Sequence, residues 1–420
     1  MNRFVYSVIL YLISPLLVLY LVFRGIKSPS YRQRWSERFG LKSLRRTDVL
    51  FHCVSMGETL AAVPLIKQLL AESPQLSVTI TTTSPTGSNE VIKAFGDQVQ
   101  HCYLPFDIPL CTQRFLTQVA PKMCVIMETE LWPNLLHFSH KKAVKLVLAN
   151  ARLSAKSAAK YQQRPRLSIP MLQQLDCILA QDKQTAERFV ALGVDSKKVS
   201  VTGSLKFDLS ISDELKVNAK ALRQIWRAEQ RPVWVAGSVH PGEFTQMIAA
   251  HKTVMQRYPS ALMIMVPRHP EQFNAAADAV VSNQLSLSRR SLQQTVDDGT
   301  QVLLGDTMGE LLQFYGAADL AFVGGTLIDN GGHNPLEPAA LGLPVFVGPQ
   351  HWDFAEITQL LQQAGGLQVV QDSDGLAQSL IALLSQPETY RDASQASLAV
   401  VADNKGAVNK QLRHLIESLG

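Results

Sequence analysis

The sequence predicts an α/β protein with two doubly wound domains and an N-terminal membrane helix. Three observations lead to this prediction. From about residue 48, short apolar runs alternate with stretches of helical spacing, which is typical of a parallel sheet covered by helices on both faces. The 420 residues exceed the length of one ordinary domain, roughly 100–200 residues. Residues 4–23 carry no charge.

The apolar runs fall into two groups. Candidate strands of the first group are residues 49–54, 76–81, 100–104, 123–127, 145–148 and 177–180. A polar helix at 213–230 separates the two groups. The candidate strands of the second group are residues 233–236, 261–266, 301–304, 320–323, 345–347 and 367–370. We therefore place the first domain at 25–207 and the second at 208–400, facing each other across a cleft. A C-terminal helix occupies 401–420.

The uncharged N-terminal segment has the length of a helix that crosses a bilayer core. No site for signal cleavage precedes Arg24, which argues against a removed signal peptide. Eight lysines and arginines but one acid lie between Arg24 and Arg46, and the positive-inside rule then places the rest of the chain in the cytoplasm. We expect residues 1–24 to be a single-pass anchor. A buried core helix and a helix lying in the membrane interface are the alternatives.

The basic character of the chain is local. Its formal charge is +5, so the remainder outside the basic segment is slightly acidic, and we expect no nucleic-acid partner. Tyr31, Trp35 and Phe39 interleave with the cations, as in segments that lie on anionic headgroups. Five cysteines without a C-x-x-C pair fit reduced thiols, and the histidines show no H-E-x-x-H spacing. We expect no metal and no cofactor.

In doubly wound folds, ligands bind beyond the carboxyl ends of the strands. The stretch Ser55-Met-Gly-Glu58 comes directly after the first strand. On its own it reads as a capping box, in which Ser55 bonds the Glu58 amide and the Glu58 side chain returns to the Ser55 amide. Gly57 in the first turn lowers helix propensity, which indicates that a ligand approaches closely there.

Two further polar segments lie at strand ends of the first domain. Glu128-Thr-Glu-Leu-Trp-Pro-Asn134 comes after the fourth strand, and its acids line a cleft more naturally than they fill a core. A first-turn acid that favours the helix dipole is the alternative, and it explains Glu130 more easily than Glu128. Lys206 lies at the predicted hinge, where it either reaches into the cleft or lies on a surface linker.

The second domain has several ligand-type segments at successive strand ends. These are Arg268-His269 after one strand, Thr307-Met-Gly-Glu310 with a capping pattern at a helix start, and two glycine pairs that lead to Asn334-Pro-Leu-Glu337. Glycine pairs let a ligand approach the backbone, and helix N-termini offer amides to a phosphate. Without a G-x-x-x-x-G-K-[ST] loop, these segments predict a nucleotide site that is not a P-loop.

The second domain is predicted to hold an anionic nucleotide, the acids of the first domain are predicted to face it, and a cationic segment lies at the membrane. These three features together fit sugar transfer from a nucleotide donor to a membrane lipid. The chain closely resembles the 3-deoxy-D-manno-octulosonic acid (Kdo) transferases of lipid A and lipopolysaccharide synthesis. The resemblance runs from the membrane segment to about Leu384. Its motifs are Val54-Ser-Met-Gly-Glu58, Glu128-Thr-Glu-Leu-Trp-Pro-Asn134, Asn150-Ala-Arg-Leu-Ser154, Gly203-Ser-Leu-Lys206, Ala236-Gly-Ser-Val-His-Pro-Gly-Glu243, Val266-Pro-Arg-His-Pro270, Gly305-Asp-Thr-Met-Gly-Glu310 and Gly331-Gly-His-Asn-Pro-Leu-Glu337.

The resemblance implies a GT-B glycosyltransferase that moves Kdo from CMP-Kdo to a tetraacylated lipid A precursor, lipid IVA, at the cytoplasmic face of the bacterial inner membrane. It implies an inverting mechanism with Glu58 as proton acceptor, and Glu128 and Lys206 as groups that stabilise the transition state. By the same resemblance, CMP contacts Arg268, His269, Met308, Gly309, Glu310, Asn334, Pro335, Leu336 and Glu337, and the terminal helix crosses back to the first domain.

Two alternatives to this function stay open at the level of sequence. One is a membrane-associated GT-B enzyme that uses a UDP-sugar, and the other is a membrane tether that binds a nucleotide without catalysis. The paired acids favour an enzyme. The sequence leaves open the number of Kdo units transferred, the acceptor's phosphorylation and acylation, and the oligomeric state.

Overall fold

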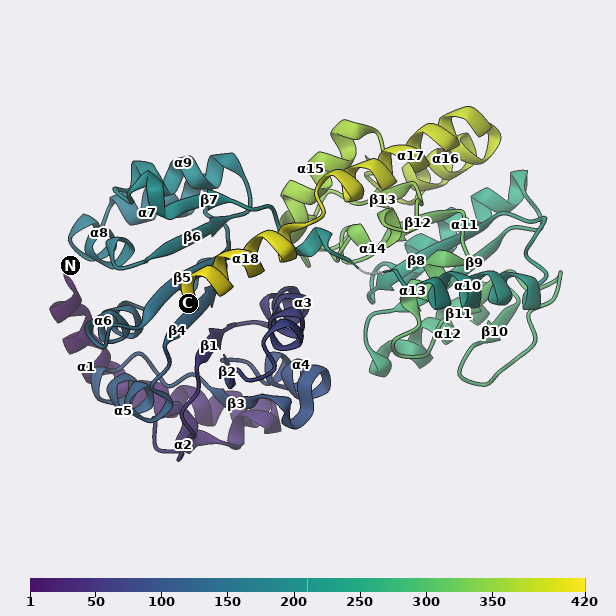
Figure 1. Cartoon of the computed structure of the whole chain (residues 1–420). Coiled ribbons are helices and arrows are strands. Elements are labelled where there is room, and N and C mark those ends of the chain that lie inside the picture. The colour runs from purple at the N-terminus through teal and green to yellow at the C-terminus, as the bar shows by residue number, and fades with distance from the viewer. Residues whose placement is uncertain (210, 420) are drawn as a thin grey trace. The chain divides into compact units, whose positions relative to one another are not determined.

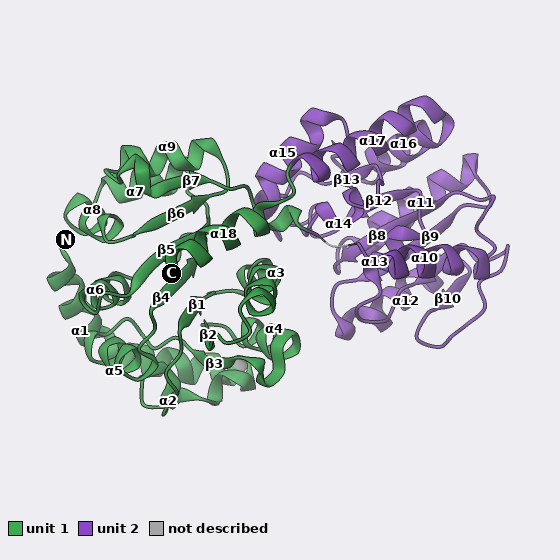
Figure 2. Ribbon diagram, viewed as in Figure 1, with its two compact units in different colours: residues 1–208, 404–420 green, residues 209–403 purple. Residues whose placement is uncertain are grey.

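The computed structural model describes residues 1–209 and 211–419 and divides them into two compact units (Figure 2). Unit 1 contains residues 1–208 together with the chain from Asn404 onwards, and unit 2 contains Leu209–Asp403. The final helix, α18 (Ala407–Leu419), therefore belongs to the same unit as the N-terminal part of the chain (Figure 1).

Unit 1 is built on a parallel seven-stranded sheet with the strand order β3-β2-β1-β4-β5-β6-β7. Its strands are β1 (Val49–His52), β2 (Val78–Thr82), β3 (Gln100–Tyr103), β4 (Met123–Met127), β5 (Lys145–Ala151), β6 (Cys177–Ala180) and β7 (Val199–Val201). Its helices are α1 (Arg3–Lys27), α2 (Trp35–Arg38), α3 (Met56–Glu72), α4 (Pro85–Phe95), α5 (Pro109–Val119), α6 (Pro133–Lys141), α7 (Ala155–Gln162), α8 (Pro165–Gln173), α9 (Lys183–Ala191) and α18.

Hydrophobic side chains on both faces of this sheet hold unit 1 together. Along β1, Val49 and Phe51 point into one core and Leu50 into the other, because successive side chains of a strand alternate between faces. The α3 and α18 side chains Leu65 and Leu412 join the first core. Burying one such side chain contributes about 1.5–3 kcal/mol, so continuous apolar strands are the expected pattern here.

Unit 2 repeats this architecture with the parallel strand order β10-β11-β9-β8-β12-β13-β14. Its strands are β8 (Val233–Val239), β9 (Leu262–Pro267), β10 (Leu287–Arg289), β11 (Val302–Leu304), β12 (Leu320–Val323), β13 (Val345–Val347) and β14 (Leu367–Val369). Its helices are α10 (Asp213–Ile225), α11 (Phe244–Arg257), α12 (Phe273–Ser282), α13 (Leu311–Gly316), α14 (Leu336–Ala339), α15 (Ala355–Ala364), α16 (Ser373–Ser385) and α17 (Pro387–Asp403). The predicted fold of two doubly wound domains is therefore confirmed.

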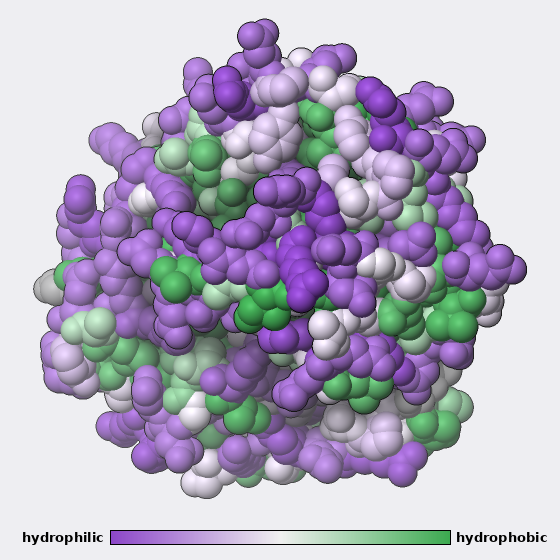
Figure 3. Space-filling model, turned by 90° about the vertical axis from the view of Figure 1, so that its right-hand side faces the viewer, coloured by the Kyte–Doolittle hydropathy of each residue, from purple (hydrophilic) through white to green (hydrophobic). Residues whose placement is uncertain are grey.

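The outer surface of the molecule differs between its parts. Figure 3 shows the side on the right of Figure 1, where elements of unit 2 lie, and hydrophobic residues form small separate groups among hydrophilic ones. Scattered groups of this kind are ordinary for a protein surface in water. Helix α1 is different, because residues 3–26 have a mean hydropathy of 2.3 and are long and apolar enough to cross a membrane.

Part of the basic segment after α1 folds into unit 1. Arg38 is buried, with its guanidinium 4.1 Å from the centre of the Tyr103 ring, a cation–π arrangement. The ring of Phe39 packs edge-on against Phe106 at 5.5 Å. Glu37 is also buried and accepts hydrogen bonds from Arg34 and Lys42. The expectation that this segment lies on lipid headgroups is therefore wrong for the buried Arg38.

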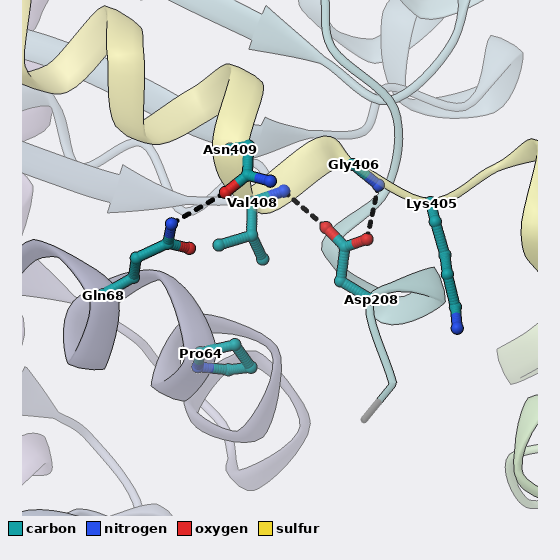
Figure 4. A pocket seen from close by; sticks show the side chains of 7 residues that line it. All are labelled: Pro64, Gln68, Asp208, Lys405, Gly406, Val408 and Asn409. Atoms are coloured by element: carbon teal, nitrogen blue, oxygen red, sulfur yellow. Dashed lines mark hydrogen bonds between the residues drawn. The ribbon is translucent and has the colours of Figure 1, made fainter. Parts of the chain in front are cut away.

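Asp208, at the end of unit 1's first segment, holds the returning chain. Its carboxylate accepts the backbone N–H groups of Gly406 at 2.6 Å and Val408 at 2.5 Å, at the start of α18 (Figure 4). The same residues line a cavity of about 500 Å³ together with Pro64, Gln68, Lys405 and Asn409. The residues lining it include none of the predicted site residues.

Candidate active site

Glu58 lies in the first turn of α3, directly beyond the carboxyl end of β1. Ser55 caps the helix, and its hydroxyl accepts the Glu58 N–H at 3.3 Å, as predicted. The predicted return bond to the Ser55 amide is wrong. The Glu58 carboxylate instead accepts the Val54 N–H at 2.8 Å and the Ser55 hydroxyl at 2.8 Å. The carboxylate is thus turned one residue further back, towards the strand end.

The surroundings of Glu58 favour its protonated form. The side chain is buried, and this burial is the largest cause that raises its pKa from 4.5 to about 7. The hydrogen bonds from Val54 and Ser55 oppose the shift, whereas the nearby charges of Glu130 and Glu128 add to it. A carboxyl group with a pKa near neutrality can exchange a proton at physiological pH.

Glu128 comes directly after β4, the strand that pairs with β1 in the sheet. Because β1 has β2 on its other side, the sheet reverses its strand order between β1 and β4, and ligands bind beyond such a point. Glu128 adopts a left-handed backbone with φ 54°, a strained conformation for a residue with a side chain. Its carboxylate lies 3.4 Å from the Lys206 ammonium.

Glu130 lies in the acidic segment that the sequence places at the cleft, but it was not among the predicted catalytic residues. Burial and the charge of Glu128 raise its pKa, and its own charge raises the pKa of Glu58. The three carboxyl groups therefore form one cluster beyond β1 and β4. The two acids directly after a buried strand are the signal in the sequence that points to Glu130 as well as to Glu128.

Three segments of unit 1 hold Lys206 in place. Lys206 lies in a short 3-10 turn (Leu205–Phe207) whose first N–H donates to the Asn150 side chain at 3.0 Å. Asn150 is fully buried at the end of β5, and its N–H donates to Gln411 of α18 at 3.1 Å. The C-terminal helix thus supports the turn that presents the lysine. The return of the terminal helix was expected from the family resemblance, but the contact between Gln411 and Asn150 was not.

Unit 2 has an arginine and three histidines at the carboxyl edge of its sheet. Arg268 and His269 come directly after β9, and the Arg268 N–H bonds the Val239 carbonyl at the end of β8. The rings of His240 and His333 stack with their Nε2 atoms 2.8 Å apart, so one ring donates and the other accepts. Burial is the largest cause that lowers the pKa of both, and the charge of Arg268 lowers it further.

His240 and His333 were not among the predicted site residues, although both lie in the quoted motifs. His240 directly follows β8, the strand where the order of this sheet reverses. A histidine at that position is a signal the sequence does contain. The T-shaped contact of the His240 and His269 rings, with centres 5.7 Å apart, brings the predicted and the missed residues together.

The glycine-rich loop after β12 is organised by Glu243 rather than left open for a phosphate. The buried Glu243 carboxylate accepts the N–H groups of Gly325 at 2.8 Å and of Thr326 and Leu327 at 3.1 Å. It also accepts the His240 N–H at 3.0 Å. The glycine pair after β12 was expected to let a ligand approach the backbone, but the N–H groups of these three residues already have a partner.

The segment Thr307–Glu310 does not form the predicted helix cap. Helix α13 begins only at Leu311, and the Thr307 hydroxyl donates to the Glu310 carboxylate. Arg290 pairs with the same carboxylate at 2.7 Å, and this hydrogen bond is the largest cause that lowers the Glu310 pKa. Met308 is exposed, and Gly309 has a φ of 88°, which favours glycine.

The segment Asn334–Glu337 lies beyond β12 and enters the short helix α14. The Asn334 side chain accepts the Leu336 N–H at 3.1 Å, while Pro335 and Leu336 are buried and shape the turn. Burial raises the pKa of Glu337, and the nearby Arg268 charge opposes this. Because β11, β9, β8 and β12 are consecutive in the sheet, all predicted residues of unit 2 lie along one edge.

Comparison with known proteins identifies the family. The chain is 41% identical over 417 residues to the 3-deoxy-D-manno-octulosonic acid transferase of Haemophilus influenzae, an alignment that covers 98% of this chain and 97% of the relative. The chain belongs to the Kdo transferase family. A Kdo transferase of Bordetella pertussis is 34% identical, with all of both chains covered. The family model described as 3-deoxy-D-manno-octulosonic-acid transferase (kdotransferase) matches residues 33–209.

Solved structures extend the comparison to the fold. The UDP-GlcNAc 2-epimerase of Neisseria meningitidis has a TM-score of 0.60 and 15% identity, and the match covers 88% of this chain and all of that one. At this identity the similarity concerns the fold alone, which is GT-B. The predicted family resemblance, fold class and glycosyltransferase class are thereby confirmed for this Kdo transferase. The roles of the individual site residues remain predictions.

Proposed function

We propose that this Kdo transferase moves Kdo from CMP-Kdo to a lipid A precursor, lipid IVA, and releases CMP. The relatives named as Kdo transferases support the sugar that is transferred. The apolar helix α1 is compatible with association with a membrane, where a lipid acceptor lies. In this proposal the enzyme acts in lipopolysaccharide core synthesis on the cytoplasmic side of the bacterial inner membrane.

The observation that carries the mechanism is the buried Glu58 carboxyl with a pKa of about 7 at the point where the sheet reverses its strand order. In an inverting displacement, Glu58 takes the proton of the acceptor hydroxyl while the oxygen attacks the anomeric carbon of Kdo. A base of this pKa is half deprotonated at pH 7 and has a stronger affinity for the proton than an ordinary carboxylate. A Cβ at Gly57 would meet Ser55 Oγ at 3.9 Å, so the backbone there leaves room for a sugar.

Glu128 and Lys206 act as a pair in this proposal. The ammonium, 3.4 Å from the Glu128 carboxylate, provides positive charge for the anionic groups of the donor as the bond to CMP breaks. Glu128 limits the rotation of the long lysine side chain and balances its charge before substrate binds. The acid cluster alone would repel an anionic donor, and the positive charge of Lys206 offsets this repulsion.

Unit 2 supplies the nucleotide site. Arg268 and His269 provide a cation and a hydrogen-bond donor for the CMP phosphate, next to the His240–His333 pair. Met308, Gly309 and Glu310 lie beyond β11, and Asn334, Pro335, Leu336 and Glu337 beyond β12. We assign the half-buried Glu337 carboxyl to the ribose hydroxyls, since carboxylates accept such hydrogen bonds.

A transfer assay with CMP-Kdo, lipid IVA and product analysis by mass spectrometry tests this proposal. Glu58→Gln is expected to abolish transfer and to leave CMP binding intact, because the nucleotide residues lie in unit 2. Glu72→Gln is the matched control, since Glu72 is an exposed acid at the other end of the same helix, α3. Normal turnover by Glu58→Gln would refute the role of Glu58 as the base.

Nucleotide choice separates this proposal from a UDP-sugar transferase. CMP is expected to raise the thermal unfolding temperature of the protein, whereas UDP at the same concentration is expected to raise it less. Stronger protection by UDP would favour the alternative donor. Product analysis in the transfer assay also counts the Kdo units added to each lipid.

A further inference from the structure

Helix α1 has two stripes of different exposure along its full length. Phe4, Leu12, Leu16 and Phe23 are 72%, 74%, 60% and 66% exposed, and their spacings of about one or two turns place them on one side of the helix. On the opposite side, Ser7, Leu21 and Gly25 are buried, and the positions between them are less exposed. One side of the helix is therefore seated on unit 1, and the other is apolar and open.

Polar contacts fix the N-terminal half of α1 to unit 1. The Ser7 hydroxyl at 3.0 Å and the Arg3 guanidinium at 3.1 Å both donate to the Asn134 side chain oxygen at the start of α6. The Tyr6 hydroxyl donates to Asp107 at 3.0 Å. Asp107 is buried and also accepts the Asn134 N–H at 2.9 Å, so these contacts form one network.

Contacts also fix the middle and the C-terminal end of α1. The Tyr11 hydroxyl accepts the Leu110 N–H at the start of α5 at 3.3 Å. The Arg32 side chain, in the turn directly after α1, donates to the Gly25 carbonyl at 2.7 Å, and the buried Arg38 joins this turn to unit 1 through the Tyr31 ring at 5.6 Å. Figure 1 shows α1 beside α6 and continuing past α5 along unit 1. Both ends of the helix are thus attached to the same unit.

A perpendicular crossing is incompatible with this attachment. A helix of 25 residues is about 37 Å long, and the hydrocarbon core is about 30 Å thick. If α1 crossed that core, the end held by Asn134 and the end joined to unit 1 through Tyr31 and Arg38 would lie near opposite faces of the bilayer. The start of α6 and the Asp107 network would then be drawn through the hydrocarbon, where polar and charged groups are costly.

We propose that α1 does not span the membrane but lies in the plane of its interface, with the stripe Phe4, Leu12, Leu16 and Phe23 inserted among lipid acyl chains. Unit 1 covers the opposite stripe. Arg24, Arg32, Arg45 and Arg46 are exposed cations on or after the helix, and they complement anionic headgroups. In this proposal a one-sided attachment takes the place of the predicted single-pass anchor. This inference does not depend on the transferase mechanism.

Depth measurements on the full chain test the orientation. One nitroxide label is placed at a time by Phe4→Cys, Leu12→Cys, Leu16→Cys or Phe23→Cys, and the protein is reconstituted in vesicles of phosphatidylethanolamine and phosphatidylglycerol. Collision rates with oxygen and with a water-soluble nickel complex then report the depth of each label. Leu10→Cys is the matched control on the covered stripe, where both collision rates are expected to be low.

Background labelling is expected to be slow. Burial raises the pKa of every native cysteine thiol, so the reactive thiolate is scarce at pH 7. These residues are Cys53, Cys102, Cys111, Cys124 and Cys177.

The proposal expects four nearly equal, shallow depths of about 5–10 Å below the headgroups. A spanning helix would give a different profile, with Leu12 and Leu16 near the bilayer centre and Phe4 and Phe23 near opposite surfaces. That profile overturns the proposal. Low oxygen collision rates at all four positions, with broadening from neighbouring labels, would mean that a second copy of the chain covers the stripe, and this also overturns it.

Discussion

The raised pKa of Glu58 makes a quantitative prediction about pH. If Glu58 is the base, only its ionised form supports transfer, and its pKa of about 7 replaces an ordinary value of 4.5. The value of kcat/KM should then fall about tenfold for each pH unit below 7 and level off above it. At pH 5 the rate should be about one hundredth of the plateau.

The same shift has a consequence for stability. The unfolded chain ionises this carboxyl near pH 4.5 and the folded protein near 7, so between these values the folded state holds the extra proton. The stability associated with Glu58 is therefore complete below pH 4.5 and is lost as the pH rises to 7. The difference of 2.5 units corresponds to about 3 kcal/mol. The side chain of Glu58→Gln does not ionise, so this variant does not lose stability as the pH rises. It should unfold at a higher temperature than the native chain at pH 8, and at about the same temperature at pH 4.5.

The assay measures initial transfer rates from pH 5 to 9 at subsaturating CMP-Kdo, with Glu130→Gln as the comparison variant. The Glu130 charge raises the Glu58 pKa, so its removal should move the acidic limb of the profile to lower pH. A profile that is flat between pH 5 and 8 would refute the assignment of the base. An acidic limb that Glu130→Gln leaves in place would refute the electrostatic coupling of the two acids.

Three further substitutions test other contacts. Lys206→Met should lower kcat about 10²–10³-fold, because it removes the ammonium that pairs with Glu128 and stabilises the negative charge of the transition state. The rise in unfolding temperature caused by CMP should be unchanged. Glu243→Gln should leave buried loop N–H groups without a partner, lower the unfolding temperature and weaken CMP protection, and unchanged protection would contradict this. Asp208→Ala should weaken the start of α18 by about 1 kcal/mol, which corresponds to about fivefold faster tryptic cleavage after Lys405. Equal cleavage rates would argue against a capping role.

The sequence predicted the central strands of both sheets because they are buried on both faces and therefore apolar without interruption. The strands β7 and β10 were missed, and both lie at the edge of their sheet. Each has only three residues and contains a serine, Ser200 or Ser288. Edge strands need less burial, so their composition is less distinctive.

The site residues at strand ends were predictable, but their partners were not. The rule that ligands bind beyond the carboxyl ends of strands indicated Glu58, Glu128 and Arg268. The partners of Asn150 and Glu243 lie far away in the sequence, at Gln411 and Gly325. Local patterns carry no information on such contacts, and for this reason the glycine loop was expected to be open to a ligand although the Glu243 carboxylate holds its N–H groups.

Asn134 belongs both to the attachment of α1 and to the segment that carries Glu128 and Glu130. It accepts the contacts from Arg3 and Ser7, and α6 begins one residue before it, directly after the acidic segment. If α1 lies at a fixed depth in the lipid, the acids stand at a fixed height above it. The bilayer then sets the distance between the catalytic acids and the membrane surface. A detergent micelle of different curvature would change this distance, and with it the transfer rate, even when the acceptor itself is freely available.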